Sequence, residues 1–175
     1  RLVALAEKHK TPMMTSSALR YGSVLRETVT EKLAQSPARF VSTSGPGLFS
    51  NYSIHQVEML VMTLGIGASR VMQCGTPDSR VMVSDYPDGS RGLIQLSPQL
   101  PFRLLCQHGE NLGFSVESFD DFFDGFIDAM LEFFRTGISS VPAKETLEIM
   151  AILEAGNASL AARDEIGRAS CRERV

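Results

Sequence analysis

The chain has 175 residues, 43% of them apolar and 21% charged, and its 17 basic and 20 acidic residues give a net charge of -3. This composition excludes disordered, collagen-like and coiled-coil proteins and predicts about one globular domain. There is no basic run to attract a nucleic acid, and no apolar stretch reaches the roughly 20 residues needed to cross a bilayer. We expect a cytoplasmic protein that binds neither nucleic acid nor membrane.

The first third of the chain mixes helical patterns with short extended ones. Apolar residues recur every three to four positions in the helical segments and at strand-like spacing in the extended ones. The tripeptide Gly45-Pro46-Gly47 is the strongest local breaker in the chain. Helices are expected over residues 2–9, 22–35 and 52–64, and strands over residues 12–17 and 39–44.

The centre changes to short strands separated by turns, and two helices follow it. Tyr86-Pro87-Asp88-Gly89 is typical of a hairpin turn, because proline presets the first bend and glycine accepts a positive φ. Connections this short cannot hold a crossover helix, so we expect the strands to pair antiparallel as a meander. Strands are expected over residues 70–73, 79–84, 92–97, 102–107 and 113–117, and helices over residues 119–135 and 142–162. The order predicts an α+β fold in which a broad, mostly antiparallel sheet is covered by helices on one face.

An aromatic cluster and the cysteines are expected to be structural. Four phenylalanines at helical spacing are expected to line a buried stripe: Phe119, Phe122, Phe123 and Phe126. Cys106 and His108 lie two apart on an expected strand and share a face, but no Cys-x-x-Cys or His-x-x-x-His pair supplies further metal ligands. We therefore expect structural roles for Cys74, Cys106 and His108, a reducing compartment, and no metal.

Three stretches, in chain order, carry a resemblance to one family. They are residues 2–14 with 19–21; residues 53–60 with 64–65; and residues 126–130 with 137, 142–148, 152–155 and 159. The first is similar to the last helix and strand of a dinucleotide-binding domain, the second to a helix with an active-site histidine, and the third to a closing pair of helices. Together they resemble the Gfo/Idh/MocA family of oxidoreductases.

The resemblance implies an enzyme that uses NAD or NADP and acts on a hydroxyl carbon of a sugar, an inositol or a related molecule. It implies that residues 1–17 are the remnant of an N-terminal dinucleotide-binding domain and that residues 18–164 are the C-terminal substrate and oligomerisation domain. The Gly-x-Gly-x-x-Gly fingerprint and the family's Glu-Lys-Pro motif do not occur in this sequence. We therefore expect that the cofactor is bound mainly by the N-terminal domain and that this chain alone is inactive.

Both ends of the sequence are expected not to be the natural ends. Arg1 begins within a helical pattern and has no N-cap residue before it, so we expect further residues upstream. Residues 166–175 are the in-frame translation of a common sequencing-library adapter, and Glu165 straddles the expected junction. We interpret residues 165–175 as adapter read-through and exclude them from the fold.

The resemblance identifies His55 as the active-site histidine. A histidine of near-neutral pKa can take a hydroxyl proton while hydride leaves the same carbon for the nicotinamide. The family usually has aspartate four residues earlier, where this chain has Asn51, whose amide can orient a hydroxyl but cannot share a proton. Glu58, one turn after His55, is expected to hold the imidazole and, with Tyr52 and Arg20, to line the substrate site.

Other interpretations of these residues and of the whole chain remain open. Taken alone, His55 is a structural or surface residue, Glu58 a solvated helix charge and Arg20 an interface charge. Asn51 in place of aspartate motivates a second hypothesis, a non-catalytic module that binds a carbohydrate-like ligand. A third is an assembly module, because the alternating apolar residues of 80–95 suit an open sheet face through which copies of the chain form a homo-oligomer.

Overall fold

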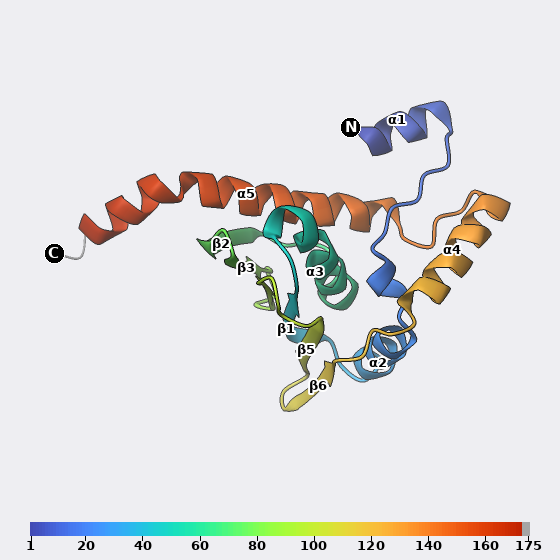
Figure 1. The fold of residues 1–175 in the computed structure, drawn as a ribbon, viewed down its shortest axis with the longest axis horizontal. Coiled ribbons are helices and arrows are strands. Elements are labelled where there is room, and N and C mark those ends of the chain that lie inside the picture. Colours follow the sequence, from blue (N-terminus) through green and yellow to red (C-terminus); the bar gives the residue numbers. More distant parts are fainter. Residues whose placement is uncertain (173–175) are drawn as a thin grey trace.

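The computed structural model describes the backbone of residues 1–172 and the side chains of residues 1–162. Helices flank a block of strands, in the predicted order except that no strand forms over residues 12–17 (Figure 1). The helices are α1 (Leu2–His9), the short 3-10 helix η1 (Ala18–Tyr21), α2 (Ser23–Leu33), α3 (Phe49–Leu64), α4 (Phe122–Thr136) and α5 (Ala143–Arg172). The strands are β1 (Ala38–Gly45), β2 (Arg70–Thr76), β3 (Ser79–Asp85), β4 (Arg91–Leu96), β5 (Arg103–His108) and β6 (Leu112–Val116). The expected adapter segment lies outside the residues whose side chains are described.

The six strands form one sheet in the order β2-β3-β4-β1-β5-β6. β1 is parallel to β4, with Phe40 opposite Arg91, and antiparallel to β5, with Val41 opposite Cys106. The other neighbouring strands are antiparallel, so the predicted fold class is confirmed. The expected meander is wrong at one point: β4 and β5 do not pair, because β1 lies between them.

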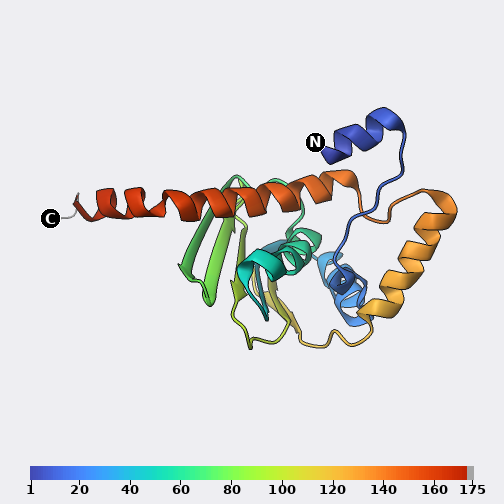
Figure 2. The ribbon, with the colours of Figure 1, turned by 45° about the horizontal axis from the view of Figure 1, so that its top comes forward.

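Helices cover one face of the sheet and enclose the core. α3 lies on β1 and β4, α5 lies on β2, and α2 contacts β6 (Figure 2). Val41 and Leu104 pack with Met59 of α3, and Ile94 packs with Leu60 of the same helix. All five are at most 1% exposed, and each such side chain contributes about 1.5–3 kcal/mol of hydrophobic stabilisation. This packing fixes α3 over the centre of the sheet.

The opposite face of the sheet is apolar at its centre and more exposed. The strand registers place Met72, Val83, Leu93, Ser42 and Leu105 in one row across five strands. Met72 and Leu105 are 59% and 55% exposed. The row is therefore an apolar surface that a single copy of the described chain leaves in contact with solvent.

Two expectations about the first part of the chain are wrong. Residues 12–17 form no strand in the described structure, and three of their side chains instead bond to α3 and α5. The helix expected from residue 52 begins at Phe49. Its N-cap residue is Leu48, which makes no side-chain capping hydrogen bond, so the sequence carries no start signal there.

The aromatic cluster is only partly buried, which corrects the expectation of a core stripe. Phe119 is 8% exposed, but Phe123 is 61% exposed, and α4 contains no buried residue. α4 lies beside η1 rather than on the sheet (Figure 2), and the ring centroids of Phe126 and Tyr21 are 5.6 Å apart. Helical periodicity indicates which face needs cover but not which element supplies it.

Cys106 and His108 occupy packed positions on the covered face of β5. Each is 2% exposed, and His108 Nδ1 lies 2.8 Å from the hydroxyl of Ser36. Burial raises the pKa of the Cys106 thiol to about 11. Among the helices that the structure describes, none has the length and apolar character required to span a membrane.

Candidate functional site

Three of the predicted site residues share the beginning of α3. Asn51 and His55 stand four residues apart on one face of the helix, with Asn51 exposed and His55 half-buried. Tyr52, 41% exposed, meets the imidazole edge-on, with 5.5 Å between the ring centroids. The structure therefore brings an amide, a phenol and an imidazole together at one end of the central helix.

The imidazole of His55 is held by Ser17, a residue for which the sequence predicted no role in the site. Nδ1 of His55 lies 2.8 Å from Oγ of Ser17. Burial lowers the pKa of His55 below its ordinary value of 6.5, because desolvation disfavours the charged ring. His55 is therefore a neutral imidazole near pH 7, able to exchange a hydrogen bond with an oxygen ligand.

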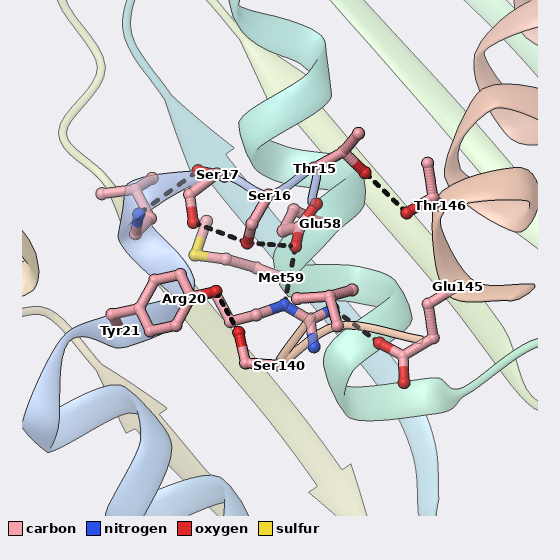
Figure 3. Close-up of polar contacts among 12 residues, drawn as sticks. Thr15, Ser16, Ser17, Arg20, Tyr21, Glu58, Met59, Ser140, Glu145 and Thr146 are labelled. Carbon is pink, nitrogen blue, oxygen red and sulfur yellow. Dashed lines mark hydrogen bonds and ion pairs between the residues drawn. The ribbon is translucent and has the colours of Figure 1, made fainter. Parts of the chain in front are cut away.

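Arg20, Glu58 and Glu145 form an ion-pair network (Figure 3). Arg20 Nε donates to Glu58 Oε1 at 2.6 Å, and Arg20 Nη2 donates to Glu145 Oε2 at 2.7 Å. The hydroxyl of Ser16 donates to the same Glu58 oxygen at 3.0 Å. The Glu58 side chain is 3% exposed, so it is not a solvated helix charge. The network joins η1 and the segment before it to α3 and α5.

The structure differs from the expectation that Glu58 orients the imidazole. The Glu58 carboxylate pairs with Arg20 and Ser16, whereas the imidazole bonds to Ser17. Substrate binding by Arg20 and Glu58 stays a prediction. The sequence does contain a sign that Ser16 and Ser17 are not part of a strand. With Thr15 they make three consecutive hydroxyl residues, whereas a half-buried strand alternates polar and apolar residues.

A cleft of about 910 Å³ lies next to this network, between α1, α4 and α5. Its lining is mostly apolar and includes Met13, Met130 and Phe126. Ile54 and Glu58 form part of its wall, whereas His55 is not among the lining residues. α3 therefore contributes to the cleft wall through neighbours of His55 and not through the imidazole itself.

The glycine-rich turn before α3 does not fit a dinucleotide phosphate. β1 leads through Gly45-Pro46-Gly47 into α3, as in a phosphate-binding strand-turn-helix unit. A side chain at Gly45 would meet the buried amide of Gln56, and one at Gly47, where φ is 86°, would meet the ring of Tyr52. The two glycines make room for the chain's own side chains, so we assign no cofactor-binding residue in the described part. That part also contains no group of three His, Cys, Asp or Glu side chains arranged for a metal.

Several dehydrogenases of known structure share the fold. A Sinorhizobium meliloti protein that carries the name of a myo-inositol dehydrogenase is 13% identical, with a TM-score of 0.77 over 92% of this chain and 67% of its own. The myo-inositol 2-dehydrogenase from Lactobacillus plantarum is 12% identical, with a TM-score of 0.70 over 90% and 66%. The WlbA dehydrogenase from Bordetella pertussis, in complex with NADH and UDP-GlcNAcA, is 14% identical, with a TM-score of 0.70 over 94% and 65%.

The comparisons confirm the predicted resemblance at the level of the fold. The matched structures are dehydrogenases of the Gfo/Idh/MocA type, and this chain has the fold of their C-terminal part. The chain spans about two thirds of the length of these structures. No family model and no curated protein matches the sequence.

Proposed function

We propose that this chain is the substrate-binding and assembly part of an NAD- or NADP-dependent oxidoreductase that acts on a hydroxyl carbon of a sugar, an inositol or a related molecule. The observation that carries the proposal is His55, a half-buried imidazole whose pKa is lowered by burial, in the first half of the central helix of a dehydrogenase fold. Oxidation of an alcohol moves hydride from carbon to the nicotinamide and a proton from oxygen to a base. An imidazole beside the substrate oxygen serves the proton half of that reaction.

The nicotinamide would come from a domain outside the described residues. Residues 1–17 belong, in this proposal, to that N-terminal domain, and residues 18–164 to the C-terminal one. α1 supports this division, because it buries no residue and leaves Leu2 74% and Leu5 51% exposed. A helix with this pattern normally packs against a partner. The chain alone would then lack the cofactor and be inactive.

The test is nicotinamide reduction by a longer protein, obtained by extending the gene upstream of Arg1. myo-Inositol and UDP-N-acetylglucosamine are the first substrates, each with NAD and with NADP. His55→Gln is expected to lower kcat/KM by about 10²–10⁴-fold, because it removes the proton acceptor. Glu27→Gln, a change at an exposed position of α2, is the control and is expected to leave the rate unchanged. A His55→Gln enzyme as active as its parent would refute the proposal.

Asn51 favours a second candidate, a module that binds a carbohydrate-like ligand without turnover. It stands one turn before His55, where the amide can orient a hydroxyl but cannot share a proton. Asn51→Asp in the longer protein separates the two candidates. The variant is expected to keep or raise the turnover of an enzyme, whereas a non-catalytic module stays silent and still binds the ligand.

The exposed row of the sheet supports assembly of identical copies through that face. Leu93 lies in the middle of the row, between Val83 and Ser42. Leu93→Asp is expected to convert the oligomer to monomers in sedimentation experiments, because the charge would be buried at the interface. Leu131→Asp, on the exposed side of α4, is the control. If Leu131→Asp dissociates the oligomer and Leu93→Asp does not, the interface lies at α4, and the proposed assembly through the sheet face is refuted.

A cytoplasmic location completes the proposal. Cys74 and Cys106 are free thiols, which suits a reducing compartment. Localisation of the tagged longer protein tests this, and recovery from an oxidising compartment would contradict it.

A further inference from the structure

Ser17 lies beside His55 with its hydroxyl in a defined hydrogen-bond environment. The residue is 5% exposed and caps the start of η1. Its Oγ accepts the backbone N–H of Leu19 at 3.3 Å and lies 2.8 Å from Nδ1 of His55. A serine hydroxyl has one hydrogen to donate and two lone pairs to accept with. Leu19 uses one lone pair, and the hydrogen needs an acceptor.

The position of the imidazole proton follows from this count. In the described part of the chain, Nδ1 of His55 is the acceptor found within hydrogen-bond distance of Oγ. If Nδ1 carried the proton, it would donate to Ser17, and the serine hydrogen would be buried without a partner. Leaving such a bond unmade disfavours an arrangement by about fivefold or more. The hydroxyl therefore donates to Nδ1, and the ring proton lies on Nε2.

We propose that Ser17 is a positioning residue that holds neutral His55 in the tautomer with its proton on Nε2. Nε2 is then a hydrogen-bond donor, which can bind an acceptor oxygen on a ligand. Nε2 can accept a substrate proton only in the other tautomer, in which the ring proton is on Nδ1. Reaching that tautomer requires the serine hydroxyl to rotate so that it accepts from Nδ1.

The consequence for substrate rests on the proposed function. A donor at Nε2 binds a carbonyl oxygen, and it binds more strongly as negative charge develops when hydride reaches the carbonyl carbon. The resting site is therefore arranged for the ketone form of the substrate, the form that is reduced. The tautomer itself is a property of the chain and requires neither cofactor nor substrate.

The test reads the tautomer directly, from two-bond ¹H–¹⁵N correlations of the histidine-labelled chain at about pH 8, where the ring is neutral. The chain has three histidines, and His55→Gln identifies the signal. We expect an unprotonated Nδ1 and a protonated Nε2 in the parent chain. Ser17→Ala is expected to lower the ratio of the Nε2-protonated to the Nδ1-protonated form by about fivefold. Ser17→Asp accepts but cannot donate when ionised, so it is expected to reverse the tautomer while still capping η1.

Two control variants separate this effect from loss of structure. Ser16→Ala removes the neighbouring hydroxyl, which bonds to Glu58 and not to the imidazole, and is expected to leave the tautomer unchanged. Ser17→Thr keeps the hydroxyl and is expected to keep the parent pattern. A protonated Nδ1 in the parent chain, or an unchanged ratio in Ser17→Ala, would overturn the proposal. An inactive longer enzyme with the expected tautomer refutes the proposed function and leaves this inference standing.

Discussion

Removal of the Arg20 guanidinium is expected to cost more stability than removal of either of its carboxylate partners. Arg20 is 13% exposed, and it is paired with Glu58, which is 3% exposed, and with Glu145, which is 23% exposed. Within the described side chains, Arg20→Met leaves the Glu58 charge buried with only the Ser16 hydroxyl as a partner, a loss of about 3–5 kcal/mol. Glu58→Gln leaves Arg20 paired with Glu145, so the loss is about 1–3 kcal/mol.

Urea unfolding and thermal melts measure this asymmetry. For a chain of this size, the Arg20→Met cost corresponds to a Tm roughly 6–20 °C lower. Arg91→Met is the matched control, because Arg91 is 58% exposed and its ion pair with Asp85 contributes about 0–1 kcal/mol. The reasoning is refuted if Arg20→Met and Arg91→Met destabilise the chain equally, or if Glu58→Gln costs more than Arg20→Met.

Three further predictions concern a thiol, a titration and two glycines. At about pH 8, iodoacetamide is expected to modify Cys74 much faster than Cys106, because Cys106 is buried and its pKa of about 11 leaves little thiolate. Equal modification rates of the two cysteines by mass spectrometry would contradict this. Because burial lowers the pKa of His55, the unfolded chain takes up a proton at this histidine before the folded chain does as the pH falls. The contribution of His55 to stability is therefore complete above pH 6.5 and is lost as the pH drops through the lowered pKa. Urea unfolding across this range should show a weaker pH dependence of the unfolding free energy in His55→Gln. Gly47→Ala and Gly65→Ala both place a side chain at positive φ, but only the new side chain at Gly47 would meet the ring of Tyr52, since the space around Gly65 is open. Gly47→Ala is therefore expected to lower the stability by about 1–3 kcal/mol more than Gly65→Ala in thermal melts. Equal losses would count against the contact with Tyr52.

The periodicity of the sequence predicts the elements of this fold better than their partners. Alternation of side chains locates each strand, but it does not say that β1 enters between β4 and β5, because pairing depends on contacts between distant residues. The same limit explains Phe123. Its spacing marks an apolar face on α4, yet the helix packs beside η1 and leaves that side exposed. Residues 12–17 have the composition of a short strand that begins with proline, but they pair with no strand in the described structure.

The candidate site was predictable where a residue type carries its own chemistry. His55 stands out because an imidazole titrates near neutral pH, and the family resemblance directs attention to its helix. Ser17 has no such mark, since a serine hydroxyl acquires a role only from what lies within hydrogen-bond distance. The pairing of Arg20 with Glu58 and Glu145 likewise joins three separate segments of the chain, and no local pattern encodes it.

The position of β1 at the centre of the sheet has a consequence for synthesis in the cell. β1 ends at Gly45, but its two neighbours, β4 and β5, are completed only at Leu96 and His108. A ribosome that adds about 5–20 residues per second needs roughly 3–13 s to make the intervening chain. Until β4 is complete the nascent strand offers two unpaired edges beside Phe40 and Val41, and until β5 is complete it still offers one, a template for pairing with other chains. The yield of folded protein should therefore depend on translation speed and on chaperones that shield this strand.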